Sequence, residues 1–192
     1  MRHIRRLAVY CGSATGNDAA FADAAGATAK AMVSQDVDLV YGGGRLGLMG
    51  LMADGVLALG GRVYGVIPHA LVDLEVAHLG LTELERVANM HERKARMTEL
   101  ADAFLCLPGG IGTLDEMFEA WSWNALGYHA KPFCLLNVAG FWDGLIAFID
   151  HATASGFLSP QRRQQLLIAD NPEAALKLLD EAAATAAQGM VW

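Results

Sequence analysis

The sequence predicts an α/β fold, a doubly wound parallel sheet with helices on both faces, formed as a single domain over residues 1–192. Short apolar runs alternate along the chain with longer amphipathic segments, and such alternation produces βαβ crossovers. Three of the apolar runs end in turns of small or glycine residues. Ligands of such sheets bind beyond the carboxyl ends of the strands, where these turns lie.

Each expected strand is a short apolar run, and each expected helix is a longer segment with apolar residues at helical spacing. The expected strands are Leu7–Cys11, Asp38–Tyr41, Val63–Ile67, Ala103–Leu107 and Phe133–Leu136. The expected helices are Asp18–Ser34, Gly47–Leu59, His91–Ala101, Thr113–Leu126, Phe141–Thr153, Pro160–Leu167 and Pro172–Ala187. The weakly patterned stretch from Val66 to Asn89 is either a lid or an excursion at the edge of the sheet.

Composition argues against several classes of protein. The net charge is −7 without a basic block, so we expect no nucleic-acid partner. The run Leu7–Cys11 is too short for a signal peptide, and no stretch approaches the roughly 20 apolar residues of a membrane span. Three cysteines in or beside strands, and six scattered histidines, lack metal-ligand spacing. We therefore expect a cytoplasmic protein without a membrane or metal site.

The segment Leu105–Trp123 carries the strongest chemical signal. A strand ends at Pro108, three glycines follow within four residues, and an amphipathic helix begins. Glycines let the backbone approach a ligand closely, and a helix N-terminus favours an anion such as phosphate. Thr113 and Glu116 lie one above the other on the first turn. The residues that predict one buried stripe on this helix are Leu114, Met117, Phe118, Trp121 and Ala125.

Two other expected strands also end in turns of small or glycine residues. Ser13 follows the first strand, where it either donates to a phosphate or simply caps a turn. Gly42, Gly44 and Gly47 satisfy G-x-G-x-x-G after the second strand, but the next strand ends in Val66–His69, without an acid for a ribose hydroxyl. The pattern favours a nucleotide site without a dinucleotide, and part of the cluster could equally serve close helix–strand packing.

Basic residues gather at the start of the helix that precedes the 105–123 segment. Met90, Arg93 and Met97 share one helical face, so apolar side chains flank Arg93. Its guanidinium either extends from the edge of the core or points into the site, and we favour the site. For Lys94 and Arg96 we expect a solvated face.

With these motifs in view, the chain resembles the LONELY GUY (LOG) family of cytokinin-activating phosphoribohydrolases. The family pattern P-G-G-x-G-T-x-x-E stands at Pro108–Glu116, and M-H-x-R-K-x-x-M stands at Met90–Met97. The segment Gly42–Gly50 and the sequence Lys131–Asn137 also match. The likeness runs from about Ala8 to Ser159.

This resemblance implies a Rossmann-like homodimer that hydrolyses the N-glycosidic bond of N6-modified adenosine 5′-monophosphates. The products would be the free base and ribose 5-phosphate, with Arg93 and Glu116 as the catalytic pair and the site near the dimer interface. The expected substrate contacts are Ser13, Gly44, Glu75, Arg93, Lys94, Gly109, Gly110, Ile111, Gly112, Thr113, Leu114, Asp115, Glu116 and Ser122. Two small departures from the family, Ala14 and Ser122, leave the reaction class unchanged.

The residue chemistry agrees with a glycosidic hydrolysis. Departure of the base builds an oxocarbenium-like sugar, which a carboxylate stabilises, so Glu116 would stabilise that cation or take a proton from water. Arg93 stays charged and is not an acid, so it would orient Glu116 or steady charge on the substrate. Asp115 and solvent are the candidates for the proton donor to the base.

Other activities stay open from sequence alone. One alternative is a broader nucleosidase that acts on AMP or other purine monophosphates, and another is a non-catalytic carrier of a nucleotide or cofactor. An older reading of the P-G-G-x-G-T-x-x-E motif as lysine decarboxylase requires pyridoxal phosphate on a lysine, for which the sequence offers no context. We therefore expect no cofactor.

Overall fold

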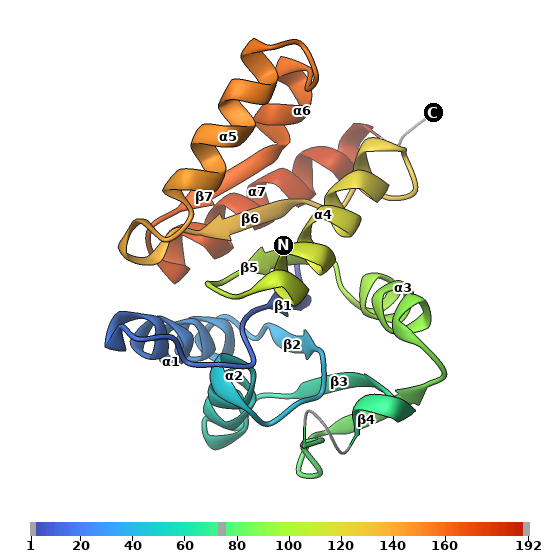
Figure 1. Ribbon diagram of the computed structural model, residues 1–192. Coiled ribbons are helices and arrows are strands. Elements are labelled where there is room, and N and C mark those ends of the chain that lie inside the picture. The colour runs from blue at the N-terminus through green and yellow to red at the C-terminus, as the bar shows by residue number, and fades with distance from the viewer. Residues whose placement is uncertain (1–2, 73–75, 190–192) are drawn as a thin grey trace.

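The computed structural model describes residues 3–72 and 76–189, which form a seven-stranded, wholly parallel sheet (Figure 1). The strand order is β4-β3-β2-β1-β5-β6-β7. The strands are β1 (Arg6–Tyr10), β2 (Asp38–Tyr41), β3 (Val63–Pro68), β4 (Glu83–Val87), β5 (Ala103–Cys106), β6 (Phe133–Leu136) and β7 (Leu166–Ala169). This arrangement confirms the predicted doubly wound, Rossmann-like α/β fold.

Helices cover both faces of the sheet. On one face pack α1 (Ala19–Ser34), α2 (Gly47–Ala58) and α7 (Pro172–Gly189). On the other pack α3 (Met90–Leu100), α4 (Ile111–Ala125) and α5 (Asp143–Ala154). The short elements are α6 (Pro160–Gln165) and the 3₁₀ turns η1 (His69–Leu71) and η2 (Val138–Gly140).

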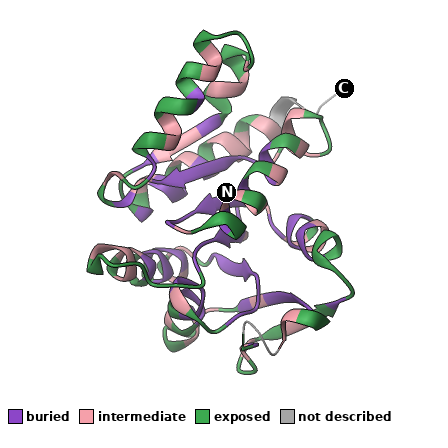
Figure 2. Cartoon of the chain, in the orientation of Figure 1, coloured by how far each residue is buried: buried purple, intermediate pink, exposed green. Residues whose placement is uncertain are grey.

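The inner strands β2, β5 and β6 are buried on both faces of the sheet (Figure 2), so they are almost continuously apolar, whereas the edge strand β4 is partly exposed. In β1, Leu7 and Val9 belong to the core under α1, α2 and α7, whereas Ala8 and Tyr10 belong to the core under α3, α4 and α5. Because successive side chains alternate between the two faces, the position of a residue in its strand determines which layer of helices it contacts.

The order of connection reverses at β1. Leu7 pairs with Leu39 of β2 on one side and with Ala103 of β5 on the other. The chain moves outward from β1 through β2, β3 and β4, then crosses back to β5. The turns after β1 and β5 therefore diverge to opposite faces and leave a crevice between them.

Two strands were not predicted. The expected helix Pro160–Leu167 ends at Gln165, because Leu166 and Leu167 belong to β7. A short apolar run is compatible with a buried strand as well as with a helix end, so periodicity could not separate them. Within the stretch from Val66 to Asn89, Glu83–Val87 forms β4 at the edge of the sheet, so an edge excursion is the better description of that part.

The prediction of one buried stripe on α4 is partly wrong. Met117 and Trp121 are buried under this helix, but Phe118 is 40% exposed. The buried stripe is therefore narrower than the run of apolar residues on this helix suggests. In the described part of the chain, no helix combines the length and apolarity needed to cross a membrane. All three cysteines are buried and free.

Candidate active site

A cavity of about 350 Å³ opens where the strand order reverses, at the carboxyl ends of β1 and β5. Its walls come from the β1 turn, the start of α2, η1, the start of α3 and the first turns of α4. The lining residues are Cys11, Gly12, Ser13, Met49, Leu71, Met90, Arg93, Gly110, Ile111, Gly112, Thr113, Asp115 and Glu116. The site thus unites both motifs that the sequence singled out.

The N-terminus of α4 faces this cavity uncapped. Gly110 is the N-cap residue and has no side chain to bond the helix, and its carbonyl accepts the N–H of Leu114 at 3.1 Å. The N–H groups of Ile111, Gly112 and Thr113 therefore have no partner within the helix. A Cβ atom on Gly110 or Gly112 would meet nothing within 4 Å. Space for an anion lies directly beside these donors.

The second glycine-rich turn, before α2, is closed. The N–H groups of Leu48 and Met49 donate to the carbonyls of Ala14 and Gly12, at 3.4 and 3.3 Å. In the first turn of α2, these two N–H groups are therefore hydrogen-bonded to the β1 turn. Gly47 has φ +57°, and a Cβ there would lie 2.2 Å from the carbonyl carbon of Ser13. Gly47 therefore serves close packing of the α2 start against the β1 turn.

The β1 and β5 turns are bonded to each other. The N–H of Gly12 donates to the carbonyl of Pro108 at 3.1 Å. A Cβ on Gly109 would lie 2.1 Å from Oγ1 of Thr113 and 2.8 Å from the nitrogen of Gly12. Gly109 is therefore required by this close approach, whereas Gly110 and Gly112 leave room for a ligand.

Arg93 lies in the cavity wall. Its residue is 3% exposed, and Nη2 donates to the carbonyl of Gly42 at 2.9 Å. A Cβ on Gly42 would lie 1.9 Å from that nitrogen, so the glycine makes room for the guanidinium. Asn89 caps α3 by accepting the N–H of Glu92 at 2.9 Å, which sets the helix start that aims Arg93 inward. Arg93 points into the site and not to solvent.

Glu116 lines the same cavity from the second turn of α4. Burial raises the pKa of the neighbouring Cys11 thiol, and the negative charge of Glu116 raises it further. Cys11 is thus held as an uncharged thiol and is unsuited to be a nucleophile. The carboxylates of Asp115 and Glu116 are then the acidic side chains that line the cavity with Arg93, beside the helix N-terminus.

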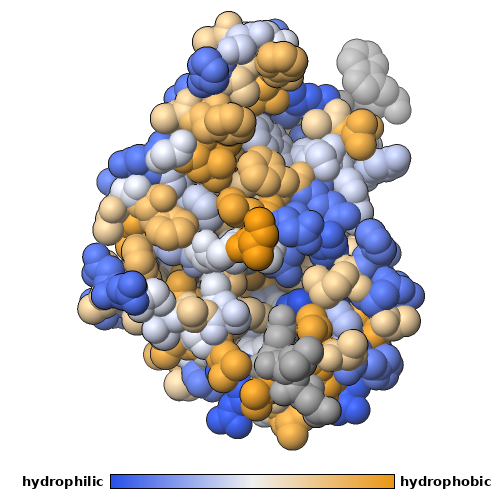
Figure 3. Space-filling model, viewed as in Figure 1, coloured by the Kyte–Doolittle hydropathy of each residue, from blue (hydrophilic) through white to orange (hydrophobic). Residues whose placement is uncertain are grey.

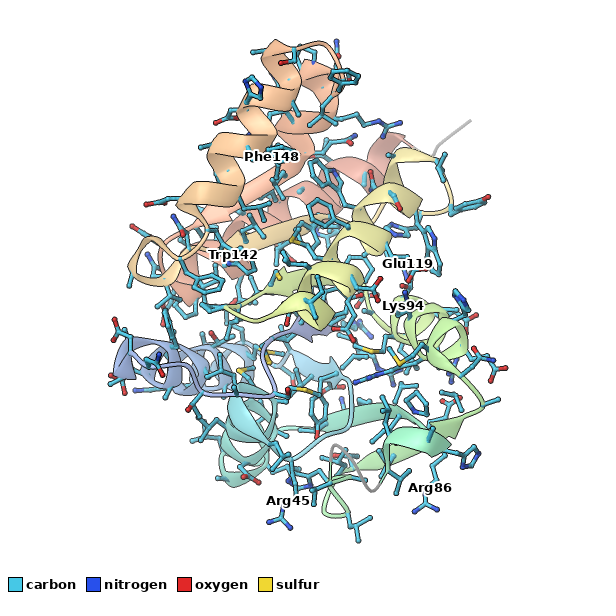
Figure 4. All side chains as sticks on the ribbon, viewed as in Figure 1. Arg45, Arg86, Lys94, Glu119, Trp142 and Phe148 are labelled. Atoms are coloured by element: carbon cyan, nitrogen blue, oxygen red, sulfur yellow. The ribbon has the colours of Figure 1, made fainter. Side chains whose placement is uncertain are left out.

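The prediction of a solvated Lys94 is wrong. Its side chain is buried between α3 and α4, with Nζ 3.1 Å from Oδ2 of Asp115 and 2.5 Å from Oε2 of Glu119 (Figure 4). Burial alone would lower the pKa of Lys94, but the hydrogen bonds and charges of Glu119 and Asp115 outweigh it and raise the pKa. Lys94 is therefore firmly an ammonium ion.

Some expected contact residues lie outside the cavity. Gly44 forms an isolated bridge with Ala77, Leu114 packs into the core beside α4, and Ser122 donates to the carbonyl of Glu119 at 3.0 Å on the exposed side of that helix. Glu75 lies outside the described residues. Gly109 and Lys94 also lie outside the cavity lining, and the substrate roles of all the expected contact residues stay predictions.

An apolar wall of the cavity was not predicted. Met49, Leu71 and Met90 line the cavity opposite the α4 turn. Met49 and Met90 belong to quoted motif segments, so their presence there was a usable signal. Leu71 comes from η1, in the weakly patterned stretch, and no local pattern marked it.

The residues at this site do not fit pyridoxal phosphate or a metal. A Schiff base needs a neutral amine, and Lys94 is held charged by two carboxylates. Among the residues that the structure describes, no group of three or more His, Cys, Asp or Glu side chains could hold a metal ion. A larger cavity of about 870 Å³, between the end of α4, α6 and α7, has no carboxylate in its lining.

Comparisons with known proteins support one family. A family model described as "Possible lysine decarboxylase" matches residues 49–179. A probable cytokinin riboside 5′-monophosphate phosphoribohydrolase, LOGL9 of Oryza sativa subsp. japonica, is 48% identical over 92% of this chain and 78% of its own length. LOG from the same plant is 45% identical over 98% and 78%, and LOG2 of Arabidopsis thaliana is 46% identical over 92% and 83%.

Solved structures show the same fold at lower identity. A molybdenum cofactor carrier protein from Chlamydomonas reinhardtii superimposes with a TM-score of 0.70 at 16% identity, covering 93% of this chain and 98% of its own. At such identity the likeness concerns the fold alone.

The packing of Gly47 gives a stability prediction. Gly47→Ala places a methyl group against the backbone of Ser13 at a positive φ, so the free energy of unfolding should fall by about 2–4 kcal/mol. The matched control is Gly26→Ala, in α1, where a Cβ meets nothing within 4 Å and stability should stay within about 1 kcal/mol. Urea unfolding measures both, and equal midpoints would contradict the proposed packing.

Proposed function

The chain belongs to the LOG family of cytokinin riboside 5′-monophosphate phosphoribohydrolases, and from this premise we propose that it hydrolyses N6-modified adenosine 5′-monophosphates. Water cleaves the bond between ribose and base, and the products are the free base and ribose 5-phosphate. The observation that carries the proposal is the open N-terminus of α4, one helical turn from Glu116 and in one cavity with Arg93.

The 5′-phosphate binds at the α4 turn. The N–H groups of Ile111, Gly112 and Thr113 face the cavity, and the helix dipole favours a negative charge there. The hydroxyl of Ser13 lies across the same cavity and adds a donor. Anchoring the phosphate fixes the ribose relative to Glu116, and positioning of this kind lowers a barrier by several kcal/mol.

Glu116 acts where positive charge develops. As the base departs, the anomeric carbon becomes oxocarbenium-like, and an adjacent carboxylate stabilises it or takes the proton of the attacking water. Arg93 is held by the carbonyl of Gly42 and steadies negative charge on the substrate or orients Glu116. The departing base gains a proton from solvent or from Asp115, whose side chain also lines the cavity.

The apolar wall supports a preference for N6-modified bases. Met49, Leu71 and Met90 offer flexible and branched apolar surface, which an alkenyl group on N6 would cover. Unmodified AMP lacks that group and would leave the wall exposed to water. This surface favours the leading proposal over a broader purine monophosphate nucleosidase.

A substrate panel tests the function. The purified protein is incubated with isopentenyladenosine monophosphate, its riboside without phosphate, and AMP, and free base is measured by chromatography. We expect the fastest release from the modified monophosphate and at least about 100-fold less from the riboside, because the phosphate anchor is lost. One methyl or methylene group in an apolar pocket discriminates by roughly 10- to 200-fold, so AMP should be a clearly poorer substrate.

Other outcomes separate the alternatives. Equal release from AMP and the modified nucleotide would indicate the broader nucleosidase. Equal release from riboside and monophosphate would place the phosphate elsewhere. A protein that binds the nucleotides without releasing base would be a carrier.

The role of Glu116 gives a second activity prediction. Glu116→Gln keeps the shape of the side chain and removes its charge, so kcat should fall by about 100-fold or more, with the fold retained. The matched control is Glu173→Gln, the same substitution at an exposed position in the first turn of α7, outside the cavity lining. A near-normal rate for Glu116→Gln would remove this carboxylate from the mechanism.

We also propose that the active form is a homodimer that pairs through α4 and α5. Apolar side chains gather over α5 and the start of α4 (Figure 3), among them Ile111, Phe118 and Phe148, which are 85%, 40% and 63% exposed. Ser122 shares the face of Ile111 and Phe118 by helical spacing. It is turned away from its own cavity, so a second copy would bring it to the neighbouring site.

The dimer has a direct test. Phe118→Asp should convert the protein to monomers in analytical ultracentrifugation and lower activity, since an apolar contact becomes a buried charge. Phe157→Asp is the control, because Phe157 is 92% exposed beyond the end of α5. A fully active monomer would contradict the pairing.

A cytoplasmic location is part of the proposal, supported by three buried free thiols, and cell fractionation tests it.

A further inference from the structure

Lys94 joins the two helices that carry the proposed catalytic pair. Arg93 and Lys94 are neighbours on α3, and Asp115 and Glu116 are neighbours on α4. The Lys94 ammonium reaches across to α4, and its contact with Glu119 at 2.5 Å is shorter than that with Asp115 at 3.1 Å. Figure 4 shows Lys94 and Glu119 pointing toward one another between the helices.

Glu119 is the principal partner of this clamp, which we define as Lys94, Asp115 and Glu119. The Glu119 side chain is 20% exposed and that of Asp115 is 57% exposed, so water screens the second contact more strongly. Removal of one member of a partly buried ion pair leaves the other charge without compensation. The geometry of α3 relative to α4 therefore depends mainly on the pair Lys94–Glu119.

The clamp is a poor ligand for a phosphate. Two carboxylates surround one ammonium, so the three side chains together carry an excess negative charge. Lys94 also lies outside the cavity lining, whereas Arg93 lies within it. The charge of Lys94 is directed at Asp115 and Glu119, and the substrate contact that the family resemblance implies for Lys94 stays a prediction.

We propose that Lys94 is a positioning residue, which ties α3 to α4 through Glu119 and so holds Arg93 in register with Glu116. This inference rests on the proposed function, because it concerns the geometry of that same pair. A displacement of about 1 Å between reacting groups is enough to slow an enzyme by about 100-fold. Because α3 carries Arg93 and α4 carries Glu116, an ion pair between these two helices holds the two side chains at a fixed separation.

The test compares kcat with KM in four variants. Lys94→Met should lower kcat by about 10- to 100-fold while KM for isopentenyladenosine monophosphate changes by less than about 2-fold. Glu119→Gln should act in the same direction, and the double variant should be no worse than Lys94→Met, since both break one interaction. Lys94→Arg keeps the charge and should restore most of kcat.

Arg96→Gln is the matched control. Arg96 lies on the same helix and also pairs with two carboxylates, those of Glu85 at 2.8 Å and Glu99 at 3.1 Å, but these belong to β4 and to α3 itself. Its loss should leave kcat unchanged. A spectroscopic readout stands apart from activity: the Nε–H resonance of Arg93, in ¹⁵N-labelled protein, should move or broaden in Lys94→Met and Glu119→Gln and stay in place in Arg96→Gln.

The outcomes are separable. A raised KM with unchanged kcat in Lys94→Met, with no effect of Glu119→Gln, would make Lys94 a substrate ligand and overturn the proposal. So would an unmoved Arg93 resonance. If Lys94→Met fails to fold, Glu119→Gln and Lys94→Arg still decide the question. An absence of base release by the wild-type protein would overturn the proposed function alone, since the resonance readout tests the clamp without turnover.

Discussion

The whole site depends on a close backbone approach between the turns after β1 and β5. The N–H of Gly12 bonds to the carbonyl of Pro108, and Gly109 packs where any side chain would collide with Thr113. This contact closes the base of the crevice with backbone alone. It leaves the next residues, Gly110 and Gly112, at the open side, so the free donors of α4 face the cavity and not the protein.

Two glycine-rich turns with similar sequences therefore differ in whether their backbone N–H groups are hydrogen-bonded within the protein. The turn before α2 donates its N–H groups to the carbonyls of Gly12 and Ala14, which satisfies that helix start and stiffens the β1 turn. The turn before α4 keeps its donors for a ligand. Composition alone does not separate the two cases, because the difference lies in whether a neighbouring carbonyl occupies the space beside each glycine.

The local sequence pattern predicted most of the sheet and the turns that carry the motifs. Its predictions were wrong where the conformation or burial of a residue depends on contacts with a neighbouring element. The helices and five strands follow from alternation and periodicity, but Leu166 and Leu167 become a strand because β6 offers an unpaired edge. Lys94 has an ordinary surface pattern and is buried because Asp115 and Glu119 come to meet it from α4. Ser122 was expected at the site from the family resemblance, although it departs from the family's usual residue, and it lies on the exposed face with Phe118 and Ile111.

The charged side chains form two groups, the proposed catalytic pair Arg93 and Glu116, and the clamp of Lys94, Asp115 and Glu119. The cavity brings together Arg93 and the carboxylate of Glu116 beside the N-terminus of α4, whose partial positive charge favours a phosphate there. Directly behind them, the ammonium of Lys94 offsets Asp115 and Glu119, which would otherwise place two further negative charges near the phosphate. Lys94 therefore offsets part of the negative charge beside Arg93 and Glu116, the proposed catalytic pair.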